Sequence, residues 1–294
     1  MLWSLILNEK EKNRMNILVA GSTGYLGSYI VKELKESEFN FKAVARNEKK
    51  LLDLGIRPNN IIKAEVTQSN SISGICKNID VVISTVGITR QKDGLTYMDV
   101  DYQANKNILV EALKSGVKKF IYVSVLNGEK LMNVEICKAK ERFVNELKSS
   151  GLDYTIIRPS GFFSDMAEFH SMAKKGKIYL FGDGHYQSNP VHGEDLAEVC
   201  VNTIAEDRTE INIGGPEVFI QTEIAGLAFD ANGKRTKIIY LPDWLRRLSL
   251  KLGKFFMSKS SFGPFEFFMT VMAMDMVAPT YGKRTLYEFY KSLK

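Results

Sequence analysis

Three glycines spaced G-x-x-G-x-x-G form a candidate cradle for a phosphate group. In such a pattern Gly21 permits a tight turn, Gly24 lets a pyrophosphate approach the backbone, and Gly27 lets a helix pack closely on a strand. The positive dipole end and free N–H groups of the helix that follows favour an anion. The residues between the glycines are counted as further candidate cofactor contacts: Ser22, Thr23, Tyr25 and Leu26.

The segments on either side of the glycines decide how this pattern is interpreted. Residues 17–20 are an apolar run typical of a buried parallel strand, and residues 28–34 have apolar side chains at helical spacing. A plain tight turn would explain the glycines alone. A strand, a glycine turn and a helix together predict a dinucleotide-binding motif.

The end of the second predicted strand, residues 41–45, bears on the choice of cofactor. Folds selective for NAD carry an acidic residue here to hold the ribose 2′-hydroxyl, whereas this chain has Arg46. Its guanidinium would bind a 2′-phosphate bidentately, with Lys49 and Lys50 close behind. The alternative is a solvated arginine that caps a helix. The sequence predicts NADP(H) in preference to NAD(H).

Strand and helix patterns then alternate regularly as far as Pro159. The predicted elements are strand 61–66, strand 80–87, helix 99–115, strand 120–124, helix 137–149 and strand 154–157. This rhythm predicts an α/β fold, a Rossmann-type doubly wound parallel sheet. Ligands bind at the carboxyl edge of such sheets. The candidate residues at strand ends are Glu65 and Val66 near the adenine, Thr85, Val86 and Gly87 near the ribose, and Ser124.

The rhythm breaks after Pro159, where the segments 161–163 and 181–184 are rich in loop-forming and aromatic residues and 210–213 is expected to be the last strand. We expect an extension at 1–14, disordered or loosely docked, an NAD(P)-binding domain at 15–160 and a substrate lobe at 161–294, with 186–215 returning to the sheet. The Phe and Met residues of 255–274 fit the core of that lobe, and a substrate or membrane-surface contact is the alternative.

Composition excludes several classes of protein. The 294 residues carry a net charge of +6 without a run of five like charges, so no nucleic-acid stripe is expected. Cys76, Cys137 and Cys200 lie far apart, which indicates neither a metal site nor a disulfide framework and fits a cytoplasmic protein. We expect neither a signal peptide nor a membrane span. We expect the protein to be a monomer or a homodimer.

The chain resembles the atypical short-chain dehydrogenase/reductases, including NmrA-like proteins, over residues 15–240. The resemblance rests on the segments 21–27, 44–46, 80–87, 120–124 and 151–159. Within that family it resembles the divinyl chlorophyllide 8-vinyl reductases, through the segments 100–104, 139–140, 159–163, 181–184, 194–197 and 213–216.

The resemblance implies roles for two side chains. Ser124 matches the serine that orients a substrate carbonyl, and Lys140 matches the lysine of the Y-x-x-x-K motif, which holds the nicotinamide ribose; Pro159 joins the implied cofactor contacts. The tyrosine of that motif, the usual proton donor, is replaced by Ile136. Asp101, Tyr102 and Lys138 are candidate donors among which the sequence does not choose. The alternative for Lys140 is a solvated lysine on the helix surface, and the alternative for Ser124 is a hydroxyl at a strand end without a role.

Two functions follow from this pattern. The first is an NADP(H)-dependent reductase acting on a hydrophobic or conjugated small molecule. The second is a catalytically silent NAD(P)-binding redox sensor, regulatory protein or assembly factor, which the loss of the tyrosine at position 136 favours. A nucleotide-sugar epimerase is disfavoured, because its mechanism needs the missing tyrosine.

Overall fold

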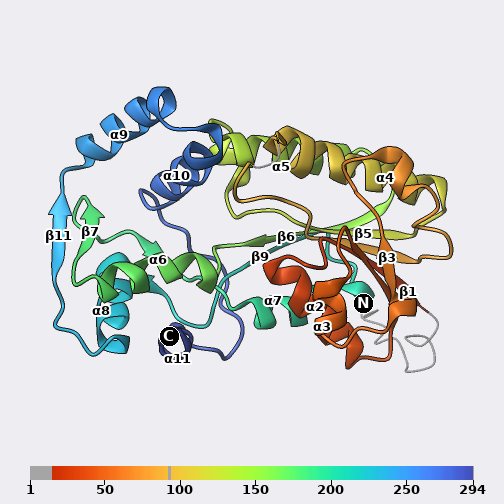
Figure 1. Cartoon of the computed structure of the whole chain (residues 1–294), viewed down its shortest axis with the longest axis horizontal. Helices are drawn as coiled ribbons and strands as arrows, with labels where there is room; N and C mark the ends of the chain where they lie inside the picture. Colours follow the sequence, from red (N-terminus) through yellow and green to blue (C-terminus); the bar gives the residue numbers. More distant parts are fainter. Residues whose placement is uncertain (1–14, 92–93, 294) are drawn as a thin grey trace, which may run out of the picture.

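A seven-stranded parallel sheet forms the centre of the molecule in the computed structural model, which describes residues 15–91 and 94–293 (Figure 1). Its strand order is β3-β2-β1-β4-β5-β6-β9, and each neighbouring pair is parallel. The strands are β1 (Asn16–Ala20), β2 (Asn40–Ala45), β3 (Ile61–Lys63), β4 (Val81–Ser84), β5 (Lys119–Val123), β6 (Asp153–Pro159) and β9 (Glu210–Ile213). The predicted doubly wound α/β class is confirmed.

Helices cover both faces of this sheet. One layer holds α4 (Asn105–Lys114) and α5 (Glu135–Lys148), and the other holds α2 (Tyr25–Lys35), α3 (Lys49–Asp53) and α7 (Gly193–Asn202) (Figure 1). Side chains along each strand alternate between the layers, as the pleat requires. Leu18 and Val82 pack under α4 and α5, whereas their neighbours Ile17 and Ile83 pack under α2 and α7. Burial on both faces explains why the strands are continuous apolar runs.

The C-terminal part forms its own small core beside the sheet. Its helices are α6 (Phe163–Lys174), α8 (Gln221–Ala231), α9 (Asp243–Phe256), α10 (Lys259–Val271) and α11 (Leu286–Ser292). Its strands are β7 (Ile178–Phe181), β8 (Gln187–Ser188), β10 (Phe219–Ile220) and β11 (Ile238–Leu241), which pair as β7 with β11 and β8 with β10. Phe163, Phe169 and Phe229 are buried in this core.

Between the two loop-rich segments, residues 163–174 form helix α6, with the Asp165 carboxylate accepting the backbone N–H of Phe162 at its start. Two local predictions need correction. The strand 210–213 is not the last, because β10 and β11 follow outside the main sheet and are too short for a clear alternating pattern. The predicted strand 61–66 ends at Lys63, where Glu65 accepts hydrogen bonds from Thr67 in a turn.

The predicted helix 99–115 also has a different beginning. Residues Met98–Ala104 form a π-helical turn, and regular α-helix starts at Asn105. Such turns are frequent at functional sites. The prediction for residues 1–14 lies outside the described residues. Among the helices that the structure describes, none combines the length and apolarity needed to cross a membrane.

Candidate functional site

The glycine loop connects β1 to α2 at the carboxyl edge of the sheet. Gly21 has φ +80°, and a Cβ there would lie 2.7 Å from the Thr85 hydroxyl oxygen, so only glycine fits. A Cβ on Gly27 would lie 2.1 Å from the Gly21 carbonyl oxygen, so glycine lets the helix pack on the loop. The N–H of Gly24 donates to that same carbonyl at 3.0 Å. The first turn of α2 carries no acidic side chain, which leaves its N-terminus suited to an anion.

The other predicted residues of this loop divide by what their side chains contact. Ser22 is buried and its hydroxyl donates to the Val44 carbonyl at 2.6 Å, while Leu26 lies in the core. The Tyr25 hydroxyl accepts the Gly193 N–H at 3.2 Å, and burial raises the pKa of Tyr25 to about 12. Thr23 is partly exposed. Ser22 and Leu26 are therefore left with their backbone N–H groups for contacting a phosphate.

Arg46 lies at the end of β2, near this loop. Its side chain is 66% exposed, and its guanidinium approaches only the Glu65 carboxylate, 3.8 Å away, among the ion pairs of the described residues. Lys50 donates to the Thr23 carbonyl, which links α3 to the glycine loop. The Val66 carbonyl accepts from Asn107 at 3.2 Å. Arg46 is thus an exposed cation with one distant ion-pair partner, Glu65, at the end of β2.

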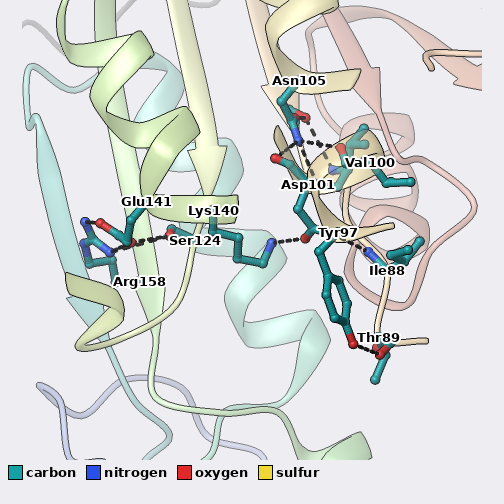
Figure 2. Close-up of polar contacts among 12 residues, drawn as sticks. Ile88, Thr89, Tyr97, Val100, Asp101, Asn105, Ser124, Lys140, Glu141 and Arg158 are labelled. Atoms are coloured by element: carbon teal, nitrogen blue, oxygen red, sulfur yellow. Dashed lines mark hydrogen bonds and ion pairs between the residues drawn. The ribbon is translucent and has the colours of Figure 1, made fainter. Parts of the chain in front are cut away.

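Lys140 of α5 extends toward the end of β4, where Gly87 and Asp101 lie (Figure 2). Its Nζ is 3.1 Å from Asp101 Oδ1, and the Asp101 side chain is fully buried. A Cβ on Gly87 would lie 2.6 Å from Asp101 Oδ1 and 3.0 Å from Lys140 Nζ. Because glycine has no Cβ, position 87 lets this ion pair lie directly against the backbone, and a larger residue there would displace it.

The π-helical turn explains how Asp101 reaches this position. The Asn105 side chain donates to the Asp101 carbonyl at 2.9 Å and to the Val86 carbonyl at 3.0 Å, which ties the turn to the end of β4 (Figure 2). The Ser84 hydroxyl donates to the Asn105 amide oxygen at 2.6 Å. Asp101 Oδ2 then accepts the Ile88 N–H at 3.2 Å.

The two oxygens of the Asp101 carboxylate have different partners. Oδ1 meets Lys140 as an ion pair but accepts no hydrogen bond among the described residues. Burial acts to lower the pKa of Lys140, but Tyr122 and Asp101 outweigh it and raise that pKa, so the ammonium stays charged. Buried polar atoms are nearly always hydrogen-bonded. Asp101 is fully buried and Lys140 is 15% exposed, so the ammonium is the group of this pair that a ribose hydroxyl could contact, with Asp101 holding it in place.

Ser124 belongs to a polar network separate from the Lys140–Asp101 pair. Its hydroxyl donates to Glu141 Oε1 at 3.0 Å (Figure 2). The same carboxylate binds the Arg158 guanidinium bidentately, at 2.5 Å and 2.9 Å, and Arg158 also pairs with Glu210. All three residues Ser124, Glu141 and Arg158 are buried. Adjacent elements therefore carry Ser124 and Lys140, but the two side chains have different partners.

The three candidate proton donors are also separated. Asp101 is beside Lys140, whereas the Tyr102 hydroxyl donates to Glu146 at 2.7 Å and Lys138 is exposed. Ile136 packs with α10 residues Phe267 and Val271 against a buried apolar cluster. The position that would carry the family's tyrosine is thus part of an apolar wall.

Helix α10 and Tyr97 close the site from the C-terminal side. The Tyr97 hydroxyl donates to the Thr89 carbonyl at 2.8 Å (Figure 2). A Cβ on Gly263 of α10 would lie 2.2 Å from the Tyr97 oxygen, so glycine allows the helix to approach the segment between β4 and the π-helical turn. Sequence reasoning missed Tyr97, Tyr122 and Glu141, because their roles depend on contacts between distant segments.

Tyr122 and His192 make contacts that stabilise the fold. Tyr122 of β5 is fully buried with Lys140 Nζ 5.6 Å from its ring centroid, and burial raises the pKa of its phenol to about 12. His192 caps α7, whose first turn is acidic, by accepting the Glu194 N–H at 3.2 Å. In the described part of the chain, no three His, Cys, Asp or Glu side chains group as a metal site.

Comparison with known proteins supports a nicotinamide cofactor. The sequence profile described as NAD(P)H-binding matches residues 21–207. The chain is 29% identical to the divinyl chlorophyllide a 8-vinyl-reductase of Arabidopsis thaliana, over 96% of this chain and 77% of that protein. It is 25% identical to the photosystem II assembly factor Ycf39 of a Synechocystis strain, over 82% of this chain and 75% of that protein.

Solved structures share the fold. An NADPH-dependent quinone oxidoreductase of Escherichia coli, solved with NADPH, matches with a TM-score of 0.70 and 17% identity, over 94% of this chain and 99% of that one. A nucleoside-diphosphate-sugar epimerase of Staphylococcus aureus matches with a TM-score of 0.71 and 18% identity, over 95% of this chain and all of that one. At these identities the likeness concerns the fold alone.

Proposed function

Because the chain belongs to the NAD(P)H-binding family, we propose that it is an NADPH-dependent reductase of a hydrophobic, conjugated small molecule. The observation that carries this proposal is the buried Lys140–Asp101 pair beside Gly87, at the carboxyl edge of the sheet that also presents the glycine loop. The similarity to a vinyl reductase and the apolar wall at Ile136 support a substrate with little polarity.

Different residues of this chain would bind different parts of NADPH. The backbone of the glycine loop would bind the pyrophosphate, and Lys140, held in place by Asp101, would bind the hydroxyls of the nicotinamide ribose. Pro159, at the end of β6, is a further proposed contact. NADPH, when bound, supplies a hydride. The Ser124 hydroxyl donates a hydrogen bond to Glu141 and accepts one from Arg158 at 3.5 Å, so it would have to give up one of these bonds to contact a substrate.

The reaction would add a hydride to one carbon of an activated double bond and a proton to the other, leaving NADP⁺. Position 136 is isoleucine, so the proton would come from water or from another acid. Turnover is tested by following NADPH oxidation with enones, quinones and vinyl tetrapyrroles. Oxidation that needs one of these acceptors supports the proposal, and tight NADPH binding without oxidation by any of them contradicts it.

A catalytically silent NADPH-binding protein is the second candidate. Two observations favour it: Ile136 replaces the usual donor, and the relatives include proteins named as assembly factors. In this case the Lys140–Asp101 site would bind NADPH and hold it without transfer of hydride. The turnover experiment separates the two candidates directly.

Cofactor preference gives a prediction at Arg46. Arg46→Asp is expected to raise the Kd for NADPH about 10- to 100-fold, because a charge-assisted contact to the 2′-phosphate is lost and a carboxylate repels it. The Kd for NADH is expected to stay within about three-fold, since it has no such phosphate. Both constants are measured by fluorescence titration.

The matched control for this prediction is Arg57→Asp. Arg57 is exposed and precedes the short helical turn Pro58–Asn60, so the change in net charge is the same but the glycine loop is not touched. Equal weakening of NADPH and NADH by Arg46→Asp, or equal weakening of NADPH by both variants, would overturn the assignment of the 2′-phosphate.

Gly87 provides a steric prediction. Gly87→Ala is expected to weaken NADPH binding at least about ten-fold, because the new methyl group pushes Asp101 and Lys140 apart and overpacking of this kind costs about 1–3 kcal/mol. Isothermal titration calorimetry measures the effect. Gly226→Ala in α8 is the control, since a Cβ there meets nothing within 4 Å. NADPH affinity unchanged by Gly87→Ala would contradict the placement of the ribose.

A further inference from the structure

Helix α9 carries a stripe of exposed apolar side chains. Phe255 and Phe256 are 76% and 83% exposed at its C-terminal end. The other exposed members of the stripe, which we call the α9 stripe, are Trp244, Leu248 and Leu252. These positions are separated by three or four residues, so they share one face of the helix. A contiguous group of large exposed apolar residues marks an interaction site.

The opposite side of α9 is already occupied. Gly253 is buried, and a Cβ there would lie 3.3 Å from the Phe262 ring. Arg246 donates to the Met269 carbonyl of α10 at 3.2 Å. Figure 1 shows α9 at the outer edge of the molecule, with α10 on its inner side. The stripe therefore faces away from the protein, on a helix that is held in place from behind.

Cations line one border of the α9 stripe. Arg247, Lys251 and Lys254 are exposed, and the helix contains a single acid, Asp243, which pairs with Arg246 at 2.6 Å and with Arg247 at 2.8 Å. At 100° per residue, these three cations lie together at one side of the apolar arc. Lys259, the first residue of α10, adds a further exposed cation. This charge pattern favours a negatively charged partner.

The length and charge of α9 determine how it would meet such a partner. Its 14 residues extend about 21 Å at 1.5 Å per residue, which is shorter than the hydrocarbon core of a bilayer, and its charged face excludes a span. A helix with an apolar face and flanking Lys and Arg side chains is suited to lie in the interface of an anionic membrane. We propose that α9 docks the protein on a membrane surface rich in anionic lipid.

This inference is independent of the proposed reductase activity. The apolar side chains would enter the boundary between headgroups and acyl chains, and the lysines would contact lipid phosphates and carboxylates. The wider stretch 255–274 divides accordingly. Phe255 and Phe256 belong to the exposed stripe, whereas Phe267, Val271 and Met274 pack against the buried cluster near Ile136.

Vesicle co-sedimentation of the full chain tests the proposal. Wild-type protein is expected to bind phosphatidylcholine vesicles containing phosphatidylglycerol and to bind pure phosphatidylcholine at least about ten-fold more weakly. Phe255→Ser/Phe256→Ser is expected to lower binding at least about ten-fold, because two large apolar side chains no longer enter the interface. Lys251→Gln/Lys254→Gln is expected to lower it about five-fold per lysine, on anionic vesicles only.

The matched control uses exposed apolar residues elsewhere. Val110→Ser/Leu113→Ser on α4 removes two exposed apolar side chains, of smaller area than the phenylalanines, and is expected to leave vesicle binding unchanged. Residues 2–7 are also apolar in sequence and could themselves bind a vesicle, so the experiment must show that α9 is the segment in contact with lipid. Trp3→Phe leaves Trp244 as the sole tryptophan, and its fluorescence is expected to be quenched by lipids brominated in the acyl chain.

Three results would overturn the proposal. The first is no binding of wild-type protein to anionic vesicles. The second is binding that persists in the Phe255→Ser/Phe256→Ser variant without quenching of Trp244. The third is a concentration-dependent dimer of the wild-type protein, seen by sedimentation, that the Phe255→Ser/Phe256→Ser variant no longer forms although its vesicle binding is unchanged. The α9 stripe would then be a contact between two copies of the chain.

Discussion

Lys140→Met is expected to raise the Kd for NADPH about 100-fold and to reduce turnover in proportion. Hydrogen bonds from a charged group contribute about 1.5–3 kcal/mol each, and methionine keeps the length of the side chain without the charge. The Asp101 carboxylate would also lose its cation while its side chain remains fully buried. NADPH affinity is measured by fluorescence titration, and turnover by absorbance at 340 nm.

A neighbouring lysine on the same helix is the control. Lys138 is exposed, so Lys138→Met is expected to leave the Kd within about two-fold, as is usual for a solvated surface charge. Asp101→Asn/Lys140→Met removes both charges and separates the lost ribose contact from the cost of an unpaired carboxylate. Wild-type affinity for NADPH in Lys140→Met, in protein that remains folded, would contradict the role of Lys140.

Glu141→Leu is expected to reduce the free energy of unfolding by about 3–5 kcal/mol, because it leaves the Arg158 guanidinium buried without its bidentate partner. Burial by itself lowers the pKa of Arg158, but Glu141 and Glu210 raise it, so the guanidinium stays charged. Glu210 is 38% exposed and is a weaker substitute for Glu141. Urea unfolding followed by circular dichroism measures the loss.

Two further variants test the cause of this loss. Glu141→Leu/Arg158→Leu is expected to recover much of the stability, since the uncompensated charge is removed together with its partner. Lys118→Met breaks the pair with Asp80, in which the lysine is 74% exposed, and should cost less than about 1 kcal/mol. If Glu141→Leu and Lys118→Met cost the same, the buried network does not hold β6 and α5 together as described.

The fold and the cofactor loop could be predicted from sequence because their signals are local. The apolar run before Gly21, the glycine spacing and the alternation of elements each lie within a short window. Gly21 and Gly27 meet the close contacts that their positions implied, with Thr85 and with the loop backbone. The role of Arg46 was inferred in the same way, from its place at the end of a strand, and stays a prediction.

The polar core of the site could not be predicted with the same detail. Asp101 is brought to Lys140 by a π-helical turn that Asn105 ties to β4, and no helical pattern distinguishes this turn from α-helix. Glu141 and Arg158 are ordinary charged residues in the sequence, and burial against each other makes them a network. The exposed stripe of α9 likewise depends on where α10 packs, which the Phe and Met composition of 255–274 did not reveal.

Hydride transfer is the central claim, and isotopic labelling measures it directly. NADPH carrying deuterium at C4 is incubated anaerobically with the protein and each acceptor, using both C4 epimers, and the product is analysed by mass spectrometry. The account predicts deuterium in one reduced product from a single epimer, and much slower transfer with Lys140→Met. Tight binding of NADPH with no deuterium in any product would contradict a reductase and support a protein that only binds the cofactor.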